Sequence, residues 1–237
     1  RPGRIEMLLG TPLGPADDPT PTKRCLEAAL ESGRQTRNHL AQLVHVPEAV
    51  GTAEAAKLGG MEWLAELQFL RTVTIPEPAQ PSGRSASLQS SITWCDCDDL
   101  DTQALHTLLL ETYVDAKDCP GLRGRREPED ILIGHEASGV RHKWMVAKIK
   151  QELVGVLLLA ETPERHLLQV LYVGVVPKFR GKRLGQQFMA RASEVAISRK
   201  LPLSLHVDRR NTPALRLYRR FDLQPRESRV AWIAEIR

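Results

Sequence analysis

Aromatic side chains are scarce in this chain of 237 residues, where Phe, Trp and Tyr together make up 5% of the positions. No apolar run approaches the roughly 20 residues that cross a bilayer, and the start of the sequence has no signal-peptide pattern. We therefore expect no membrane partner. The four cysteines show neither paired CxxC spacing nor a disulfide framework, so we expect a protein of the reducing cytoplasm.

Charge and metal-binding residues are equally unremarkable in number and spacing. The net charge of +4 permits anionic ligands but does not by itself indicate nucleic acid. Cys95 and Cys97 flank Asp96 and could in principle bind a metal ion. Alternation within SITWCDCDDL more simply fits the end of a strand, and we expect no metal site.

Two common nucleotide-binding motifs are also missing. A P-loop needs GxxxxGK[ST], but Gly174 and Gly181 are too far apart and Arg183 follows Lys182. The GxGxxG pattern of dinucleotide-binding folds does not occur. The sequence excludes both motifs as the source of any phosphate binding.

A stretch without apolar periodicity divides the chain into two portions. Residues 74–90, TIPEPAQPSGRSASLQS, contain prolines, a glycine and small polar residues, which is typical of a linker. We expect a partial domain over residues 1–73 and a larger domain over residues 91–237.

The larger portion alternates strand and helix patterns, which predicts a mixed α/β fold. Helical patterns occupy residues 101–115, a segment that begins at 184, and residues 212–221. Strand patterns occupy residues 91–97, 143–150, 152–161, 166–176, 201–207 and 228–236. Residues 116–139 show neither period, and we expect them to be irregular.

The N-terminal portion contains a weak copy of the end of this pattern. Residues 40–73 read as strand, His-Val, small-residue helix and apolar strand, in the same order as residues 201–236. Residues 4–14 and 20–36 likewise read as strand then helix. We interpret this as an internal repeat whose first copy is only a half.

Residues 176–188, VPKFRGKRLGQQF, join a strand to a helix through glycines and cations. A helix N-terminus presents unpaired N–H groups and the positive end of the helix dipole, and glycines let a phosphate approach the backbone. The stretch is therefore either a phosphate cradle or a solvated basic turn.

This loop and a later helix together resemble the GNAT superfamily of acyl-CoA-dependent N-acyltransferases, in a bacterial tandem or half-tandem form. The pyrophosphate-loop pattern V-x-P-x-x-[RQ]-x-x-G-x-[GA] is matched at Val175, Pro177, Arg180 and Gly185. The later pattern N-x-x-A-x-x-L-Y is matched at Asn211, Ala214, Leu217 and Tyr218. The resemblance covers essentially all of residues 91–237 and implies a GNAT fold preceded by a degenerate half-repeat. Arg183 stands where the family has a glycine, and Asp222-Leu223 replaces its usual Gly-Phe.

The resemblance implies that acetyl-CoA lies in a V-shaped opening between the strands at 166–176 and 201–207. Backbone groups of Gly174, Val175 and Val176 would pair with the pantetheine arm. Backbone N–H groups of the loop would hold the pyrophosphate: Arg180, Gly181, Lys182, Arg183, Leu184, Gly185 and Gln186. Asn211 would either hydrogen-bond acetyl-CoA or cap the helix that follows it.

Tyr218 is the predicted general acid, since a hydroxyl near sulfur can protonate the departing thiolate. His206 and Glu111 are candidates for the base, although the His-Val pair at 45–46 suggests that His206 is a packing residue. Asp115, Asp118 and Cys119 follow the first helix of the larger portion, where this family builds its acceptor pocket. We expect these three to line that pocket, with Cys119 as a free thiol rather than a nucleophile.

The predicted function is metal-free transfer of an acetyl or short acyl group from CoA to the primary amine of a small molecule or peptide. An acyl-CoA-binding regulatory module without turnover is the alternative, motivated by Arg183 and the decayed first copy. Nucleic-acid binding through the basic residues is a third hypothesis: Arg180, Lys182, Arg183, Arg209, Arg210, Arg219 and Arg220. Few aromatics and no reader motif argue against it. The first copy is also expected to serve as an intramolecular partner in a pseudo-dimer.

Overall fold

The computed structural model describes residues 5–9, 18–36, 38–76, 92–126, 128–136 and 140–236. Most of the predicted linker, residues 77–90, lies outside this range. The described strands are β1 (Ile5–Leu9), β2 (Leu40–His45), β3 (Glu62–Arg71), β4 (Ile92–Asp96), β5 (Val140–Ile149), β6 (Glu152–Thr162), β7 (Leu167–Val175), β8 (Leu203–Asp208) and β9 (Gln224–Glu235). The described α-helices are α1 (Thr20–Gln35), α2 (Val50–Leu58), α4 (Thr102–Tyr113), α5 (Pro128–Glu136), α6 (Leu184–Arg199) and α7 (Thr212–Arg219).

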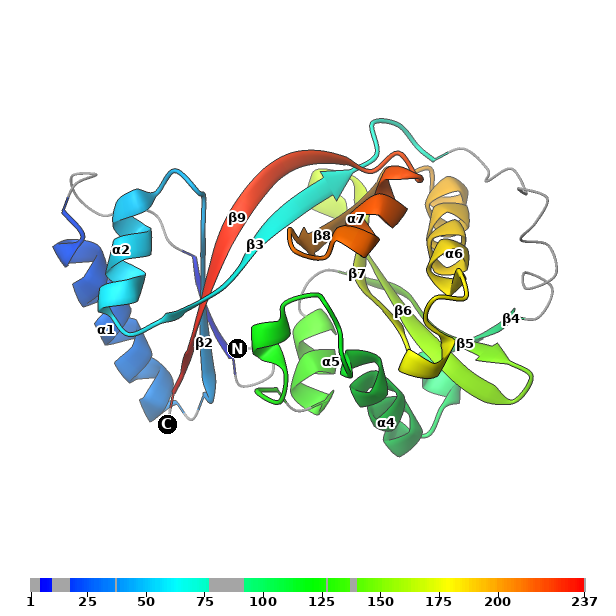
Figure 1. Cartoon of the computed structure of the whole chain (residues 1–237), viewed down its shortest axis with the longest axis horizontal. Helices are drawn as coiled ribbons and strands as arrows, with labels where there is room; N and C mark the ends of the chain where they lie inside the picture. The colour runs from blue at the N-terminus through cyan, green and yellow to red at the C-terminus, as the bar shows by residue number, and fades with distance from the viewer. Residues whose placement is uncertain are drawn as a thin grey trace.

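All the described strands join in one mixed sheet in the order β1-β2-β9-β3-β8-β7-β6-β5-β4. Figure 1 shows α1 and α2 beside β1 and β2 at one end of the molecule, and α4 to α7 around the other end. The predicted mixed α/β fold is therefore confirmed. Among the described residues, no helix is both long and apolar enough to cross a bilayer.

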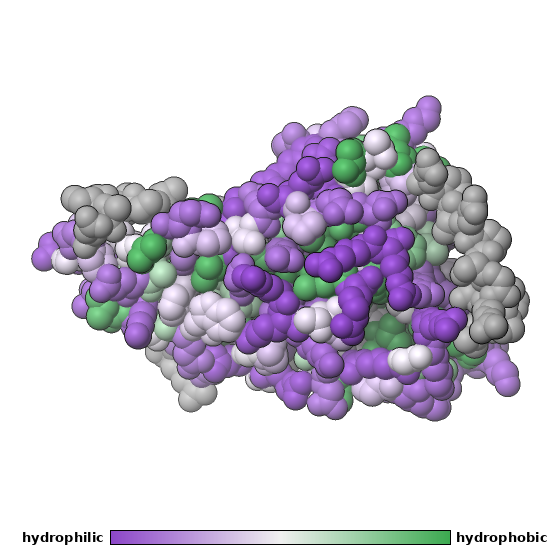
Figure 2. Space-filling model, turned by 45° about the horizontal axis from the view of Figure 1, so that its top comes forward, coloured by the Kyte–Doolittle hydropathy of each residue, from purple (hydrophilic) through white to green (hydrophobic). Residues whose placement is uncertain are grey.

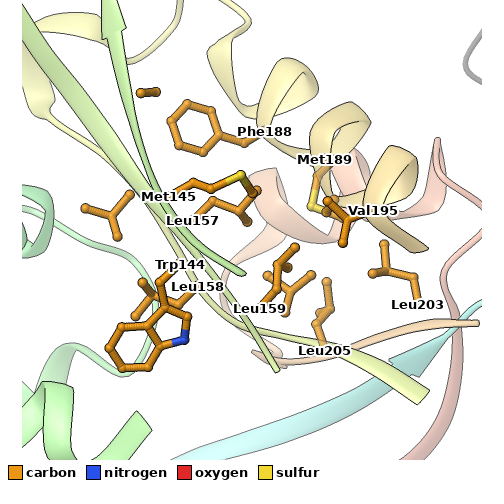
Figure 3. Packing of buried hydrophobic residues seen from close by; sticks show 14 of the residues in the cluster. Trp144, Met145, Leu157, Leu158, Leu159, Phe188, Met189, Val195, Leu203 and Leu205 are labelled. Atoms are coloured by element: carbon orange, nitrogen blue, oxygen red, sulfur yellow. The ribbon is translucent and has the colours of Figure 1, made fainter. Parts of the chain in front are cut away.

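The main core lies where helices cover both faces of β5, β6 and β7. Residues Val154 to Ala160 of β6 are all buried, because α4 and α6 both contact this strand. A strand covered on both faces reads as a continuous apolar run, which is what VGVLLLA shows. In Figure 3, Phe188 and Met189 of α6 point toward Met145 and Leu157 on the neighbouring strands.

The two predicted portions interleave their strands in this sheet. β3 pairs antiparallel with β8 on one side and with β9 on the other, while β9 also pairs antiparallel with β2. β9 is thus separated from β8 by β3, and Figure 1 shows β3 and β9 running together across the middle of the molecule. The order β1-α1-β2-α2-β3 is the same as the order β7-α6-β8-α7-β9. A common origin of the two segments stays a prediction.

The prediction of an irregular segment over residues 116–139 was wrong in part. It contains a 3-10 turn at Pro120–Leu122 and helix α5, in which Ile131 is buried and Leu132 packs against the main core. The helix has nine residues, too few to show a clear helical period in the sequence. The face of the molecule in Figure 2 is mainly hydrophilic, with apolar residues in smaller areas between the polar ones.

Candidate active site

The parallel strands β7 and β8 separate partway along their length. They pair only at Leu168–Leu203, Gln169–Ser204 and Val170–Leu205. The register between β6 and β7 shifts beside Leu171, so that Leu159 faces Val170 while Leu158 faces Tyr172. Such a bulge bends a strand. β7 therefore runs on to Val175 beside β6, and its edge toward β8 is left open for a ligand.

The loop after β7 leads into α6 through two residues in the left-handed region. Gly181 has φ +76° and Arg183 has φ +61°, directly before α6 begins at Leu184. Asp222 also has a left-handed φ of +56°. Both departures from the family pattern are thus explained by the backbone, which adopts a conformation that favours glycine. The Arg183 side chain is exposed and does not fill the site.

The Arg180 side chain forms hydrogen bonds within the protein and is not positioned as a phosphate ligand. Its Nε donates to the carbonyl oxygen of Val175 and its guanidinium NH2 donates to that of Thr112, both at 2.9 Å. The guanidinium therefore joins the end of β7 to the last turn of α4. The predicted contact of Arg180 with pyrophosphate through its backbone N–H does not compete with these two side-chain hydrogen bonds.

A cavity of about 660 Å³ opens between the separated strands and the segment that follows α4. Seven of the predicted site residues line it: Gly174, Val175, Arg180, Gly181, His206, Asn211 and Tyr218. Six others are not on its wall: Val176, Lys182, Arg183, Leu184, Gly185 and Gln186. Glu111 is also absent from this wall, because it lies on the exposed face of α4 in a separate hollow with Asp101 and Leu153. The structure thus does not bring Glu111 together with Tyr218.

Tyr218 is presented to the cavity by α7. Asn211 begins this helix by accepting a hydrogen bond from the Ala214 N–H at 3.3 Å, so its side chain does act as a cap. Tyr218 is 7% exposed, and among the described residues its hydroxyl has no hydrogen-bond partner. Burial, and secondarily the Asp118 charge, raises the pKa of Tyr218, so the hydroxyl keeps its proton at neutral pH.

Asp118 and Cys119 lie opposite Tyr218, fixed to the end of β8. The Asp208 N–H donates to the Asp118 carboxylate at 2.8 Å, and the Cys119 N–H donates to the Asp208 carboxylate at 3.2 Å. Asp118 is exposed as a residue, but its carboxylate is enclosed by this turn, and burial raises its pKa. Burial, followed by the Asp118 and Asp208 charges, raises the pKa of the Cys119 thiol to about 12.

The buried Asp208 carboxylate is neutralised by Arg210, which donates to it at 2.6 Å. Arg210 also donates to the Leu64 carbonyl of β3 at 2.8 Å and lies 4.7 Å from the centre of the Trp63 ring. Arg209 pairs with Glu66 on the same strand. The N-terminal portion therefore supports the turn that carries Asp118.

Several polar and aromatic residues of the wall escaped the sequence interpretation. Tyr113 and Tyr172 stack at 5.1 Å between ring centres, and the Tyr172 hydroxyl lies 2.7 Å from that of Thr112. His135 lies 5.8 Å from Tyr172, and Arg126 lines the same wall. His135 belongs to α5, which was not predicted. Tyr172 lies in the predicted strand over residues 166–176. Side chains alternate between the two faces of a strand, so the sequence could indicate only that Tyr172 faces one side of the sheet.

His206 lies on the wall but is poorly placed as a base. The Gln169 amide donates to its Nδ1 at 3.2 Å, and the ring packs against Phe69 with 5.0 Å between ring centres. With Nδ1 occupied as an acceptor, the neutral ring carries its hydrogen on Nε2 and has no free lone pair. This geometry favours packing over proton transfer.

The sequence profile of the acetyltransferase (GNAT) family matches residues 102–223, and none of the curated proteins matches the sequence. The fold is similar to a GCN5-related N-acetyltransferase from Sphaerobacter thermophilus, with a TM-score of 0.60 and 16% identity over 100% of this chain and 75% of that one. It is similar to a conserved protein of unknown function from Staphylococcus epidermidis, with a TM-score of 0.61 and 13% identity over 97% and 84% of the two chains. A tandem GNAT protein from the clavulanic acid biosynthesis pathway has a TM-score of 0.57 and 14% identity over 91% and 70%.

At these identities the three structures establish the fold and no more. The profile, in contrast, spans α4 to α7 and includes both the loop before α6 and the helix that carries Tyr218. Acyl transfer is the general chemistry of this family. With more than half of its residues matched, the chain belongs to the GNAT acetyltransferase family.

Proposed function

We propose that the protein transfers an acetyl or short acyl group from CoA to a primary amine, by direct attack within a ternary complex. One observation carries this proposal: the opening between β7 and β8 leads into a cavity that contains both Tyr218 and Asp118. One group can supply a proton and the other can accept one, and both face the end of the strand opening.

The open edge of β7 and the following loop fit acyl-CoA. Gly174 lines the cavity, and only glycine fits there, since a Cβ would lie 2.7 Å from both the Tyr172 hydroxyl and Thr112 Cβ. The loop turns through Gly181 and Arg183 so that the first N–H groups of α6 face outward, where a pyrophosphate finds donors and the positive helix end. Acetyl-CoA would thus be held mainly by backbone atoms, with Arg180 fixing their position from behind.

Tyr218 and Asp118 would divide the proton transfers of the reaction. The amine nitrogen forms a bond to the thioester carbonyl carbon, and the carbon–sulfur bond breaks as the tetrahedral intermediate collapses. The Tyr218 hydroxyl gives its proton to the departing sulfur, while Asp118 accepts the proton that the amine loses. The raised pKa of Asp118 brings it closer to that of a general base working near neutral pH.

Cys119 is unsuited to an alternative, two-step mechanism. A covalent acyl-enzyme needs a thiolate, but burial raises the pKa of this thiol to about 12. The described residues offer it no histidine as an activating base within hydrogen-bond reach. These observations support direct transfer and leave Cys119 as part of the wall.

Nucleic-acid binding is the weaker alternative. Of the basic residues on which it depends, Arg180 donates to two carbonyl groups, Arg209 pairs with Glu66, and Arg210 pairs with Asp208. Cations already engaged inside the protein contribute little to phosphate contacts. We also propose that the N-terminal portion acts as a structural partner within the chain and binds no acyl-CoA.

Calorimetric titration with acetyl-CoA, followed by a screen of amines for release of free CoA thiol, tests the proposal. We expect one acetyl-CoA per chain and thiol release that depends on an added amine. Binding without release from any amine would favour the regulatory alternative. Absence of binding would rule out both the enzyme and the acyl-CoA-binding module.

A further inference from the structure

Arg126 is a cation of the cavity wall for which the described part of the chain provides no partner. It is half-buried, and among the described residues its guanidinium forms neither an ion pair nor a hydrogen bond. Its Nε is fully buried. An unsatisfied charged donor in such a place is costly, and a bound anion would remove that cost.

The neighbouring cations are accounted for in other ways. Arg123 pairs with Asp115 at 3.5 Å, Arg125 pairs with Glu62 at 2.9 Å, and Arg180 donates to two carbonyl groups. Lys117 is exposed. The pairing of Arg125 with β3 fixes the chain next to Arg126 and so presents Arg126 to the cavity.

Two polar groups of the cavity wall that feel the Arg126 charge, His135 and Tyr113, are neutral at pH 7. His135 has its pKa lowered to about 4, first by burial and then by the Arg126 charge, so its ring is neutral at pH 7. Tyr113 has its pKa raised by burial and keeps its hydroxyl proton. An anion at Arg126 would therefore meet no opposing carboxylate from these two residues and could accept a hydrogen bond from a tyrosine.

The opposite charge on the wall comes from Asp118, which is held at the turn beside Asn211 and near Tyr218. Asp118 and Arg126 both line the same cavity of about 660 Å³, so one ligand in that cavity can meet both charges. The cavity wall therefore carries charges of both signs, the Asp118 carboxylate and the Arg126 guanidinium.

We propose that the acceptor is an amine that also carries a carboxylate, with its amino group at Asp118 and its carboxylate at Arg126. This inference rests on the proposed function and adds the substrate class to it. The planar guanidinium matches a carboxylate through two parallel hydrogen bonds, and its single charge matches a single negative charge. Arg126 is then a specificity-determining residue that takes no part in the proton transfers.

Matched acceptor pairs test the inference: 4-aminobutyrate against n-butylamine, and L-phenylalanine against phenethylamine, with CoA thiol release as the readout. In the unchanged protein kcat/KM should be at least about tenfold higher for the better of the two carboxylated amines than for its partner. In Arg126→Gln the value for that acid should fall by about 10- to 100-fold, while the value for the plain amine stays within about threefold. Arg126→Lys should show an intermediate loss, because it keeps the charge without the planar fork.

Arg216→Gln is the matched control, since it removes the same charge from an exposed position on α7 outside the cavity. This substitution should leave kcat/KM unchanged for both the carboxylated amine and its plain partner. An equal rate for acid and plain amine in the unchanged protein, or a preference for the acid that survives in Arg126→Gln, would overturn the inference.

A binding measurement separates this inference from the proposed function. N-acetyl-4-aminobutyrate and N-butylacetamide are titrated into the protein in the presence of CoA. Tighter binding of the acid that is lost in Arg126→Gln supports the inference, even if no amine gives thiol release. A lack of thiol release would contradict only the proposed function. Equal binding of the two probes would contradict the inference alone.

Discussion

At the scale of single residues, backbone conformation explains two substitutions that look unfavourable in the sequence. Arg183 and Asp222 stand where related enzymes have glycine, and each has φ near +60°. A non-glycine residue tolerates this region at a modest cost in free energy. The loop before α6 therefore keeps a left-handed turn at residue 183, although the sequence lacks the usual glycine.

Arg183→Gly should raise the free energy of unfolding by up to about 1 kcal/mol, because glycine adopts the left-handed conformation without strain. Urea denaturation of the two proteins measures the difference. Since the Arg183 side chain is exposed, the affinity for acetyl-CoA should change little. A clear fall in stability would show that Arg183 makes a favourable contact absent from the structure.

His135 should make the stability of the protein depend on pH. Its pKa is about 4 in the folded state and near 6.5 when unfolded, so the unfolded chain binds a proton more readily. The contribution of neutral His135 to the free energy of unfolding is fully present above pH 6.5. This contribution, up to about 3 kcal/mol, is lost as the pH falls toward 4. His135→Gln should lack this component, as urea denaturation at pH 7 and pH 4.5 would show. The same pH dependence in both proteins would contradict the assignment.

At the scale of elements, Arg180 shows what the sequence motif leaves unsaid. The motif predicted the loop, the start of α6 and the following helix, because these depend on local patterns of glycine, proline and apolar spacing. It could not show that the arginine side chain points back to α4, since Thr112 is 68 positions away in the chain. Helix α5 and the cavity wall that it forms were likewise missed, because a nine-residue helix gives little periodic signal.

Arg180→Met should destabilise the fold by about 1–3 kcal/mol, because the carbonyl groups of Val175 and Thr112 lose a charged donor in a half-buried place. Urea denaturation provides the measurement. Lys178→Met is the matched control, since Lys178 is exposed and, within the described part of the chain, contacts Glu152 and the Phe179 ring. If Arg180→Met proved no more destabilising than this control, the internal role of Arg180 would be wrong.

At the scale of the whole molecule, the interleaving of β3 and β9 makes the two portions dependent on each other. The sequence indicated a half-copy and a linker, but similarity between segments cannot say which strand edges pair. β3 fills the position between β8 and β9, and its residues Leu64 and Glu66 support the turn that carries Asp118. A strand of the smaller portion therefore supports the candidate site from outside, although none of its described residues lines the cavity.

Cutting the chain should not separate the two portions. A protease site introduced within residues 82–86 would yield two fragments that still share the pairings of β3 with β8 and β9 and of β2 with β9. The cut protein should elute as one species in size-exclusion chromatography and should separate only in denaturant. Two independent folded fragments would contradict the interleaved sheet.

The role of Tyr218 connects all three scales, because its position depends on the Asn211 cap, on α7 and on the opening between β7 and β8. The most direct measurement is kcat for amine-dependent CoA release by Tyr218→Phe, alongside its affinity for acetyl-CoA by calorimetry. We expect kcat to fall by about 100-fold or more with acetyl-CoA affinity nearly unchanged, because only the proton donor is lost. Unchanged kcat would contradict the assignment of Tyr218 as the acid that protonates the departing thiolate.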